Sequence, residues 1–294
     1  MDIKQEIPYC YDNGDSSMKV SKCLRELKNE FPLIKEDDIK YFIVELMELQ
    51  SLELFLHYEE DIREDKYLQI KDMLNRRSAG EPLQYIMGKA YFRNYELKVG
   101  NGVLIPRPET EILVDECLDI LKGRGDTKIC DMGTGSGAIA ISIASEQPNA
   151  EVFAVDISAT ALKYALENIN RYKLNERIRL IQSNLFENFK NIQCDVIAAN
   201  LPYVAYNFLP SMDKEVKSYE PHLALFAEDA GLKIIKECAE EGYAFLVSGG
   251  SIIFEISPEQ EVKCLEILKS LNYKNIRSIN DLTGRVRFCA GVAK

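Results

Sequence analysis

The chain is poor in residues that build metal sites, and it has no long apolar run. Only two histidines occur among its 294 residues, and its eight cysteines are scattered without C-x-x-C spacing. No apolar stretch approaches the ~20 residues that a membrane-spanning helix needs. Residues 1–8 also lack a basic segment followed by an apolar core, the pattern of a signal peptide. We therefore expect no metal, no membrane segment, a cytoplasmic location, and buried free thiols rather than disulfides.

Positive charge is also scarce. The formal net charge is -11, and no run of Lys and Arg is longer than Arg76-Arg77. Broad adhesion to nucleic-acid phosphates needs clustered basic side chains, so we expect no direct nucleic-acid binding. Residues 1–88 carry 19 acidic against 12 basic side chains. That acidic part is either an ordinary solubilising surface or a surface complementary to a basic protein partner.

The length suggests two domains, and the apolar pattern changes along the chain. Residues 1–17 are polar and are expected to form a loosely attached tail. Residues 18–88 show helical spacing, with Val20, Leu24, Leu27 and Phe31 along one face. Further helices are expected at 39–58 and 64–77, followed by a short turn or helix that ends near residue 88. This part is predicted to be a small all-α domain.

Residues 89–108 are expected to link the two domains as a β-hairpin. The first strand would run from about residue 90 to 99, with Gly100-Asn101-Gly102 as the turn and residues 103–105 as the second strand. Pro106 and Pro108 cannot continue a strand ladder, so a helix is expected to begin at about residue 109.

From residue 109 to the end, strands and helices alternate, which predicts a doubly wound, mostly parallel sheet. The final two predicted strands have no helix between them, so an antiparallel strand should close the sheet. A Rossmann-like sheet of seven strands is the expected α/β fold. The expected strands are residues 128–131, 152–156, 178–181, 195–199, 251–255, 274–279 and 285–290; the main helices between them are 138–146, 159–171, 231–241 and 258–271.

A glycine-rich loop follows the first of these strands and opens a helix. Gly133, Gly135 and Gly137 permit a tight turn and a close approach of a ligand to the backbone, and Asp131 precedes them. Asp156 ends the next strand, where a carboxylate can accept hydrogen bonds from ribose hydroxyls. The combination resembles the first two motifs of the Rossmann-like S-adenosylmethionine-dependent methyltransferases, in which Asp131 would help to orient the cofactor.

This resemblance implies that the chain binds S-adenosylmethionine and releases S-adenosylhomocysteine. In that family, residues after the third strand commonly contact the adenine. Here Asn184 holds that place, and Leu185 and Phe186 either supply apolar contact with the ring or pack in the core. The cofactor-binding residues expected from the resemblance are Gly133, Thr134, Gly135, Ser136, Gly137, Asp156, Asn184, Leu185 and Asn200.

Asn200-Leu201-Pro202-Tyr203 follows the fourth strand, at the sheet edge where ligands bind in open α/β folds. The Asn200 side-chain carbonyl and the Leu201 backbone carbonyl offer two acceptors, and Tyr203 offers a flat wall. Two acceptors and a ring could clamp a planar NH2 group, either of an amide or of a nucleobase. Methyl transfer needs a nucleophile that is held close and aligned more than it needs a strong base. A plain strand ending in a Pro turn is the structural alternative.

Flanking motifs resemble the release factor glutamine methyltransferases over roughly residues 19 to 292. The motifs are Gly80-Glu-Pro-Leu-Gln-Tyr-Ile-Met-Gly88, Leu104-Ile-Pro-Arg-Pro-Glu-Thr-Glu111, Tyr219-Glu-Pro-His-Leu-Ala-Leu225 and Asp229-Ala-Gly231. The resemblance implies a protein substrate, the glutamine of the Gly-Gly-Gln loop of peptide chain release factors. It also implies that the helical domain, residues 18–88, docks the factor and that a methyltransferase domain covers residues 109–294. Separately, we expect a monomer.

By the same resemblance, Asn200 and Tyr203 are catalytic, and Asn200, Leu201, Pro202 and Tyr203 bind the substrate amide. Two positions depart from the family pattern. The family usually has Pro at position 201, and Glu255-Ile-Ser257 replaces a Glu-His-Gly-like segment. Leu permits more backbone freedom than Pro but keeps the carbonyl acceptor.

Two other functions stay open at this point. The tetrapeptide at residues 200–203 also matches adenine-N6 methyltransferases that act on RNA or DNA, although the low positive charge counts against them. A cofactor-binding protein that has lost activity and serves as an assembly partner is the third possibility. Labelled S-adenosylmethionine offered with either a release factor or rRNA separates these hypotheses.

Overall fold

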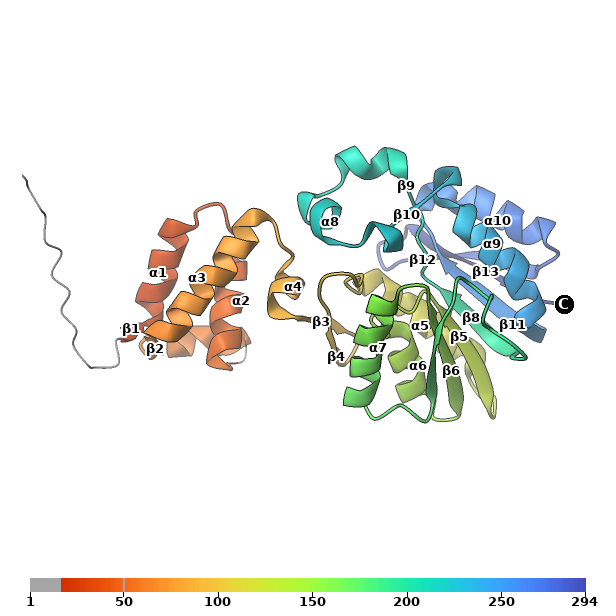
Figure 1. Cartoon of the computed structure of the whole chain (residues 1–294), viewed down its shortest axis with the longest axis horizontal. Helices are drawn as coiled ribbons and strands as arrows, with labels where there is room; N and C mark the ends of the chain where they lie inside the picture. The colour runs from red at the N-terminus through yellow and green to blue at the C-terminus, as the bar shows by residue number, and fades with distance from the viewer. Residues whose placement is uncertain (1–16, 50) are drawn as a thin grey trace, which may run out of the picture. The chain divides into compact units, whose positions relative to one another are not determined.

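The computed structural model describes residues 17–49 and 51–294, and for residues 51–53 the backbone alone. The predicted polar tail lies outside the described residues except for Ser17. The chain divides into two compact units, one reaching to Ile86 and the other spanning Met87–Lys294. We call them the helical unit and the sheet unit, and Figure 1 shows the elements of each.

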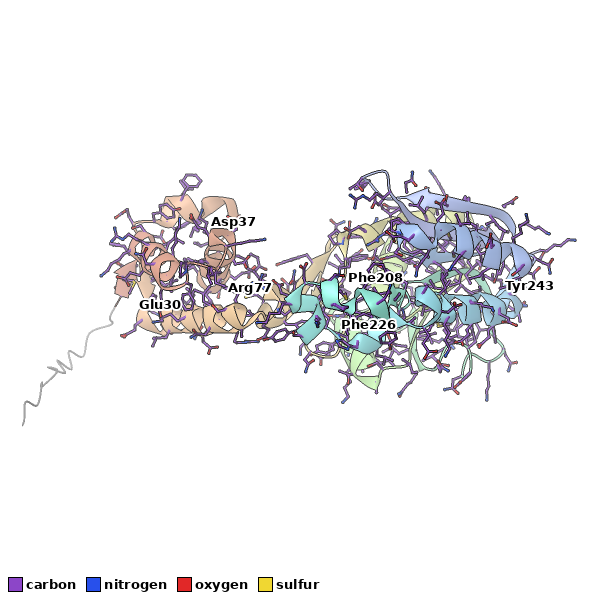
Figure 2. All side chains as sticks on the ribbon, turned by 90° about the horizontal axis from the view of Figure 1, so that it is seen from above. Glu30, Asp37, Arg77, Phe208, Phe226 and Tyr243 are labelled. Atoms are coloured by element: carbon purple, nitrogen blue, oxygen red, sulfur yellow. The ribbon has the colours of Figure 1, made fainter. Side chains whose placement is uncertain are left out.

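The helical unit is built around three main helices whose apolar faces meet. Its core side chains are fully buried, among them Leu27, Ile39, Phe42 and Leu74. Arg77 donates from Nε to Asp38 Oδ2 at 2.7 Å and so joins α3 to α2; Figure 2 labels Arg77 on its helix. The elements are β1 (Ser17–Lys19), α1 (Val20–Glu30), α2 (Glu36–Met47), η1 (Ser51–His57), β2 (Asp61–Arg63) and α3 (Glu64–Ala79); α4 (Leu83–Met87) crosses into the sheet unit.

The helical unit differs from the prediction in two places. The helix expected over residues 39–58 ends at Met47, because Glu48 takes a left-handed conformation with φ 58°. The apolar residues beyond it continue in a 3₁₀ helix, so periodic spacing alone did not reveal the break. In addition, β1 and β2 pair as antiparallel strands, with Met18 opposite Ile62. The unit is therefore mainly helical rather than purely helical.

The hairpin after the helical unit turns earlier than predicted. Strands β3 (Lys89–Phe92) and β4 (Tyr95–Lys98) pair antiparallel with Phe92 opposite Tyr95, so the turn falls at Arg93 and Asn94. The expected turn at residues 100–102 was wrong. Arg93 has φ 51°, and its guanidinium bonds to Asp115 and Glu146. These carboxylates, distant in the sequence, stabilise the unfavourable left-handed conformation of Arg93, which the local sequence does not predict.

The sheet unit contains the predicted seven-stranded sheet, in the order β12-β13-β11-β8-β5-β6-β7. Strand β13 is antiparallel to both β11 and β12, and the other neighbours pair in parallel. The prediction of a mostly parallel sheet closed by an antiparallel last strand is confirmed. The strands are β5 (Thr127–Met132), β6 (Ala150–Asp156), β7 (Ile178–Gln182), β8 (Cys194–Ala199), β11 (Leu246–Glu255), β12 (Lys274–Asn280) and β13 (Val286–Val292).

Helices cover both faces of this sheet (Figure 1). One apolar core lies under α5, α6 and α7 and the hairpin, and the other lies under α9 and α10. The seven described cysteines are buried, as predicted. Within residues 17–49 and 51–294, no helix is long and apolar enough to cross a membrane. The helices are α5 (Glu111–Leu121), α6 (Ala138–Glu146), α7 (Ala159–Arg171), α9 (Lys233–Gly242) and α10 (Glu261–Ser270).

A segment between β8 and α9 was not predicted to have regular structure. Strand β9 (Val204–Ala205) pairs in parallel with β10 (Phe226–Ala227). After α8 (Lys214–Tyr219), the chain therefore comes back beside residues 204–205. Tyr206 stacks on Phe226 with ring centroids 5.2 Å apart. Figure 2 labels Phe226 and Phe208 on this segment. The pairing brings residues 219–231 beside the end of the tetrapeptide at 200–203.

Candidate active site

One cavity opens at the carboxyl ends of β5, β6 and β8, where the predicted site residues meet. Because these strands are adjacent and parallel, the loops that follow them lie along one edge of the sheet. Of the predicted site residues, Gly137 and Tyr203 do not line this cavity. Those that do are Gly133, Thr134, Gly135, Ser136, Asp156, Asn184, Leu185, Asn200, Leu201 and Pro202.

The glycine loop packs directly against the tetrapeptide. Gly133 has φ 79° and donates from its backbone N–H to the Val155 carbonyl at 2.8 Å. A Cβ at this position would lie 3.1 Å from the Asn200 backbone oxygen and 3.3 Å from Leu201 Cδ2. Leu201, 5% exposed, therefore fills the space beside the loop. The residue that departs from the family pattern thus packs against the predicted cofactor loop.

Asp131 is hydrogen-bonded to the glycine loop and to the helix that follows it, and it does not line the cavity. Its Oδ2 accepts hydrogen bonds from the Thr134 hydroxyl at 2.6 Å and the Ala140 N–H at 3.1 Å. Within the described residues, its buried Oδ1 has no partner. Burial raises the pKa of Asp131 to about 7, against the opposing effect of those two hydrogen bonds. Asp131 therefore orients the loop that surrounds a ligand rather than the ligand itself.

Asp156 stands at the end of β6 with its carboxylate at the cavity wall. Its oxygens accept from the backbone N–H groups of Gly135 at 2.9 Å and Ser158 at 2.8 Å. Burial raises its pKa, and these N–H donors oppose the shift. A carboxylate oxygen can accept more than one hydrogen bond, so Asp156 keeps capacity for a hydroxyl pair on a ligand.

The residues after β7 divide between the cavity and the core. Leu185 lines the cavity in a left-handed conformation with φ 44°, while exposed Asn184 donates to Glu187 at 3.0 Å. Phe186 does not line the cavity. It stacks on Phe245 with centroids 4.7 Å apart, inside the core. Of its two predicted roles, Phe186 has the structural one.

Asn200 belongs to a chain of hydrogen bonds that crosses three segments. Its Nδ2 donates to Thr110 Oγ1 at 3.1 Å, and that hydroxyl donates to Glu255 Oε2 at 2.6 Å. The Tyr203 hydroxyl donates to the other oxygen, Glu255 Oε1, at 2.9 Å. Glu255 is 1% exposed at the end of β11. Burial raises the pKa of Glu255, while the hydrogen bonds from Thr110 and Tyr203 and the charge of Arg287 oppose the shift.

Tyr203 faces a neighbouring cavity rather than the main one. That second cavity also includes Phe208, Ala230 and Lys263 among its lining residues. Burial, and then the negative charge of Glu255, raise the pKa of Tyr203, so its phenol stays protonated. The ring is held by its hydroxyl and lies near Arg287, whose guanidinium carbon is 5.9 Å from the ring centroid.

The backbone of the tetrapeptide is fixed by a second set of contacts. Gln260 Nε2 donates to the carbonyls of Tyr203 at 2.7 Å and Ala230 at 2.8 Å. Gly231 has φ 85°, and a Cβ there would lie 1.9 Å from the Tyr203 oxygen. The motif at 229–231 thus closes tightly over the end of the tetrapeptide, and only glycine fits.

The motif at 104–111 also reaches the cavity. Arg107 lines it and pairs with Glu220 at 2.5 Å, and Glu220 is 4% exposed. This ion pair joins the two motifs that flank the tetrapeptide in the sequence. Sequence reasoning quoted Arg107, Thr110, Glu220 and Glu255 inside motifs but gave them no role. Nothing in their spacing predicts which side chains meet across loops.

The cavity fits S-adenosylmethionine. The Asp156 carboxylate suits a ribose diol, and Leu185 and Ile157 offer apolar walls for an adenine. Ile157 is 49% exposed although it lines the cavity, as expected of a side chain that a ligand would cover. Apart from its chain neighbours, the nearest described atoms to a Cβ built on Gly135 are Gly133 O and Val103 Cγ2, both at 4.0 Å, so the loop leaves room for a ligand.

Comparison with known proteins agrees with this geometry. The family model described as the methyltransferase small domain matches residues 109–209, and the PrmC N-terminal domain matches residues 20–88. The chain is 35% identical over 270 residues to the release factor glutamine methyltransferase of Thermodesulfovibrio yellowstonii, covering 91% of this chain and 95% of that protein. The chain belongs to the release factor glutamine methyltransferase family. Membership confirms the resemblance seen in the motifs. It also confirms the prediction that the chain is an S-adenosylmethionine-dependent methyltransferase.

Other relatives of this glutamine methyltransferase family member are longer or more distant. A bifunctional methyltransferase of Rickettsia felis is 37% identical over 262 residues, which cover 80% of this chain. The chain spans about half, 50%, of the length of that relative. A solved 16S rRNA N2 methyltransferase of T. thermophilus matches 70% of this chain and 50% of its own, with 15% identity and a TM-score of 0.52. That similarity concerns the fold alone.

Proposed function

We propose that this enzyme transfers a methyl group from S-adenosylmethionine to the side-chain amide nitrogen of the glutamine in the Gly-Gly-Gln loop of peptide chain release factors. The observation that carries the proposal is the Asn200 amide, which lines the same cavity as the glycine loop and is bonded through its NH2 end to Thr110. Its Oδ1 is then the end available to a substrate amide. Relatives that bear the family name span nearly the whole chain.

Catalysis by these residues is mainly positioning. The bound cofactor supplies a methyl group made electrophilic by the adjacent sulfonium. Asn200 Oδ1 and the Leu201 carbonyl accept the two N–H hydrogens of the glutamine, which orients its nitrogen. The amide nitrogen is a poor nucleophile because its lone pair is delocalised, so alignment must contribute most of the rate. Fixed carbonyl acceptors also suit the charge that spreads over the nitrogen in the transition state.

The cofactor contacts follow from the same cavity. Asp156 would accept hydrogen bonds from the ribose hydroxyls, Leu185 and Asn184 would hold the adenine, and the loop of Gly133 and Gly135, which continues to Gly137 outside the cavity lining, would hold the amino-acid part. Thr134 and Ser136 shape this loop, and Asn200 would lie near the bound cofactor because it lines the same cavity. Tyr203 supports the clamp by holding Glu255, and Pro202 keeps its backbone extended. S-adenosylhomocysteine leaves as a neutral thioether, the methylated amide nitrogen releases one proton to solvent, and no metal takes part.

The rest of the chain serves substrate docking. The acidic helical domain, residues 18–88, docks the body of the release factor, and residues 89–108 connect it to the methyltransferase domain at 109–294. The enzyme works as a cytoplasmic monomer. Charge supports this division of roles, since the acidic balance of residues 1–88 suits a partner with basic surface.

The test uses labelled S-adenosylmethionine with three acceptors: a release factor, the same factor with its Gly-Gly-Gln glutamine changed to alanine, and rRNA. We expect label in the first alone. Label in rRNA instead would favour the adenine-N6 function that the tetrapeptide also allows. Retained cofactor binding without transfer to either would favour a protein that has lost its activity.

A further inference from the structure

The hydrogen-bond chain behind Asn200 fixes more than the position of this side chain. An asparagine amide has two ends of nearly equal shape, one an acceptor and one a donor. Only the acceptor end can receive the N–H groups of a glutamine amide. If the amide turned over, its NH2 would face the NH2 of the substrate, and the clamp would repel what it must hold.

The direction of each bond in the chain can be deduced from its last member. An ionised carboxylate only accepts, and Glu255 receives one hydroxyl at each oxygen, Thr110 at 2.6 Å and Tyr203 at 2.9 Å. The shorter distance lies in the range of an O–H···O⁻ hydrogen bond. The single proton of Thr110 is therefore committed to Glu255. What remains at Thr110 Oγ1 is a lone pair.

That lone pair faces Asn200 at 3.1 Å, so it accepts only the NH2 end. Among the described residues, no donor bonds to Asn200 Oδ1, which leaves the carbonyl to the cavity that Asn200 and Thr110 both line. Thr110 is 4% exposed and Glu255 is 1% exposed, so water competes little for these bonds.

We propose that Thr110, held by Glu255, is a positioning residue that keeps the carbonyl end of Asn200 toward the substrate and so makes the site select an amide over a carboxylate. This inference rests on the proposed function. A glutamate in place of the substrate glutamine would bring oxygens against the Asn200 carbonyl. The wild-type site rejects it, whereas a site with a reversed Asn200 amide would offer it a donor.

The first test replaces the hydroxyl by a methyl group of similar shape, Thr110→Val, and compares it with Thr110→Ser, which keeps the hydroxyl. Both are assayed with a release factor and labelled S-adenosylmethionine. We expect Thr110→Val to lower kcat about tenfold, the size of one net hydrogen bond, with little change in cofactor affinity. Thr110→Ser should restore most of the rate.

The matched control is Thr127→Val. Thr127 begins β5, at the end of that strand away from the cavity; it is 3% exposed, and its hydroxyl has no partner within the described residues. The same exchange there removes a buried hydroxyl without touching the chain to Asn200. Wild-type kcat in this variant would show that loss of a buried threonine hydroxyl is not by itself the cause.

The selective readout is inhibition by a release factor in which glutamate replaces the Gly-Gly-Gln glutamine. Wild type should discriminate strongly, with an inhibition constant for the glutamate factor well above the KM for the glutamine factor. In Thr110→Val this ratio should fall several-fold, and in Thr110→Ser it should stay. If Thr110 had a purely structural role, its replacement would weaken binding of the glutamine factor and the glutamate factor alike. The ratio would then stay unchanged, which would overturn the inference.

A measurement on the wild-type chain needs no variant to fold. The side-chain NH2 of Asn200, identified by NMR, should exchange with solvent more slowly than an exposed amide because Thr110 holds it. Exchange at the exposed rate would contradict the proposal. Absence of any transfer by wild type would instead refute the proposed function, so the two failures are distinguishable.

Discussion

At the scale of single residues, the site depends on which atoms are already committed. Asn200 is bonded through its NH2 end and Tyr203 through its hydroxyl, and both bonds lead to Glu255. The atoms that remain for a substrate are therefore the carbonyl oxygens of Asn200 and Leu201, which suit a nitrogen nucleophile that carries hydrogens. The clamp proposed for four adjacent residues would be held in place by two buried residues far away in the sequence, Thr110 and Glu255.

Replacing Asn200 tests the clamp directly. Asn200→Ala removes the side-chain acceptor, and loss of alignment of the substrate nitrogen should lower kcat about 100-fold or more. Since Asn200 is only partly buried, the variant should unfold at nearly the same denaturant concentration as wild type. Transfer to a release factor and chemical denaturation measure the two effects. A folded Asn200→Ala enzyme with wild-type kcat would show that the clamp lies elsewhere.

Asp131 gives a second prediction at this scale, concerning pH and stability. Folding raises its pKa from 3.8 to about 7, so between these values the folded chain binds the proton more tightly. The contribution of Asp131 to the free energy of unfolding therefore falls as pH rises through this window, by at most about 1.4 kcal/mol per pH unit. It is constant above the window.

The variant Asp131→Asn carries no titrating proton, so this slope disappears. Urea denaturation of both proteins at several values between about pH 4 and about pH 7.5 measures the difference in their free energies of unfolding. Wild type should lose stability relative to Asp131→Asn as pH rises to about 7. Parallel pH profiles would mean that Asp131 titrates at an ordinary carboxyl pKa.

At the scale of elements, the site depends on loops that close over one another at the sheet edge. Gly231 lies beneath the Tyr203 carbonyl, and Gln260 bridges that carbonyl to Ala230. The short parallel pair β9 and β10 brings these loops together. A substitution that displaces one of these loops should therefore also displace the tetrapeptide at 200–203, although the strands themselves stay intact.

Gly231→Ala tests this closure, with Gly284→Ala as its matched control. Both glycines have positive φ, 85° and 83°, but a Cβ at Gly284 meets nothing within 4 Å. The control should cost about 1 kcal/mol of backbone strain. Gly231→Ala adds a clash with the Tyr203 carbonyl and should cost ~1–3 kcal/mol more, with a marked loss of activity. Equal losses in stability and activity would contradict tight closure at Gly231.

The elements also show how far sequence reasoning extends. The alternation of strand and helix segments located the helices at 138–146 and 159–171, which the structure confirms. Strand β11 was missed over its first part because Ser248, Gly249 and Gly250 interrupt the apolar pattern at a bulge. The turn at Arg93 was missed because partners on α5 and α6 stabilise it.

The same distinction applies to the site. Residues that follow strands were predictable, because strand ends share one edge in a parallel sheet. Thr110, Glu255 and Gln260 were not, since their roles depend on which loops pack together. Tyr203 was predicted to lie beside the substrate amide. Its contact with Glu255 could not be predicted from residues 200–203 alone. The role of Tyr203 and the other site residues in catalysis stays a prediction.

At the scale of the whole molecule, the chain consists of two units with separate cores. Every residue that lines the main cavity lies in the sheet unit. Binding of the cofactor should therefore need only Met87–Lys294, while recognition of a large protein substrate would also use the helical unit.

A fragment of residues 87–294 tests this division. We expect it to bind S-adenosylmethionine with an affinity close to that of the full chain, measured by calorimetry. Its KM for a release factor should rise at least tenfold, because docking contacts are lost while the clamp remains. An unchanged KM would show that the helical unit does not take part in docking.

The central claim is that the group methylated is the side-chain amide of one glutamine. The most direct measurement is mass spectrometry of a release factor after incubation with the full chain and S-adenosylmethionine. We predict one added methyl group, located by fragmentation on the glutamine of the Gly-Gly-Gln loop and formed about 100-fold more slowly with Asn200→Ala. A methyl group on another residue, or transfer to rRNA with the factor unmodified, would contradict it.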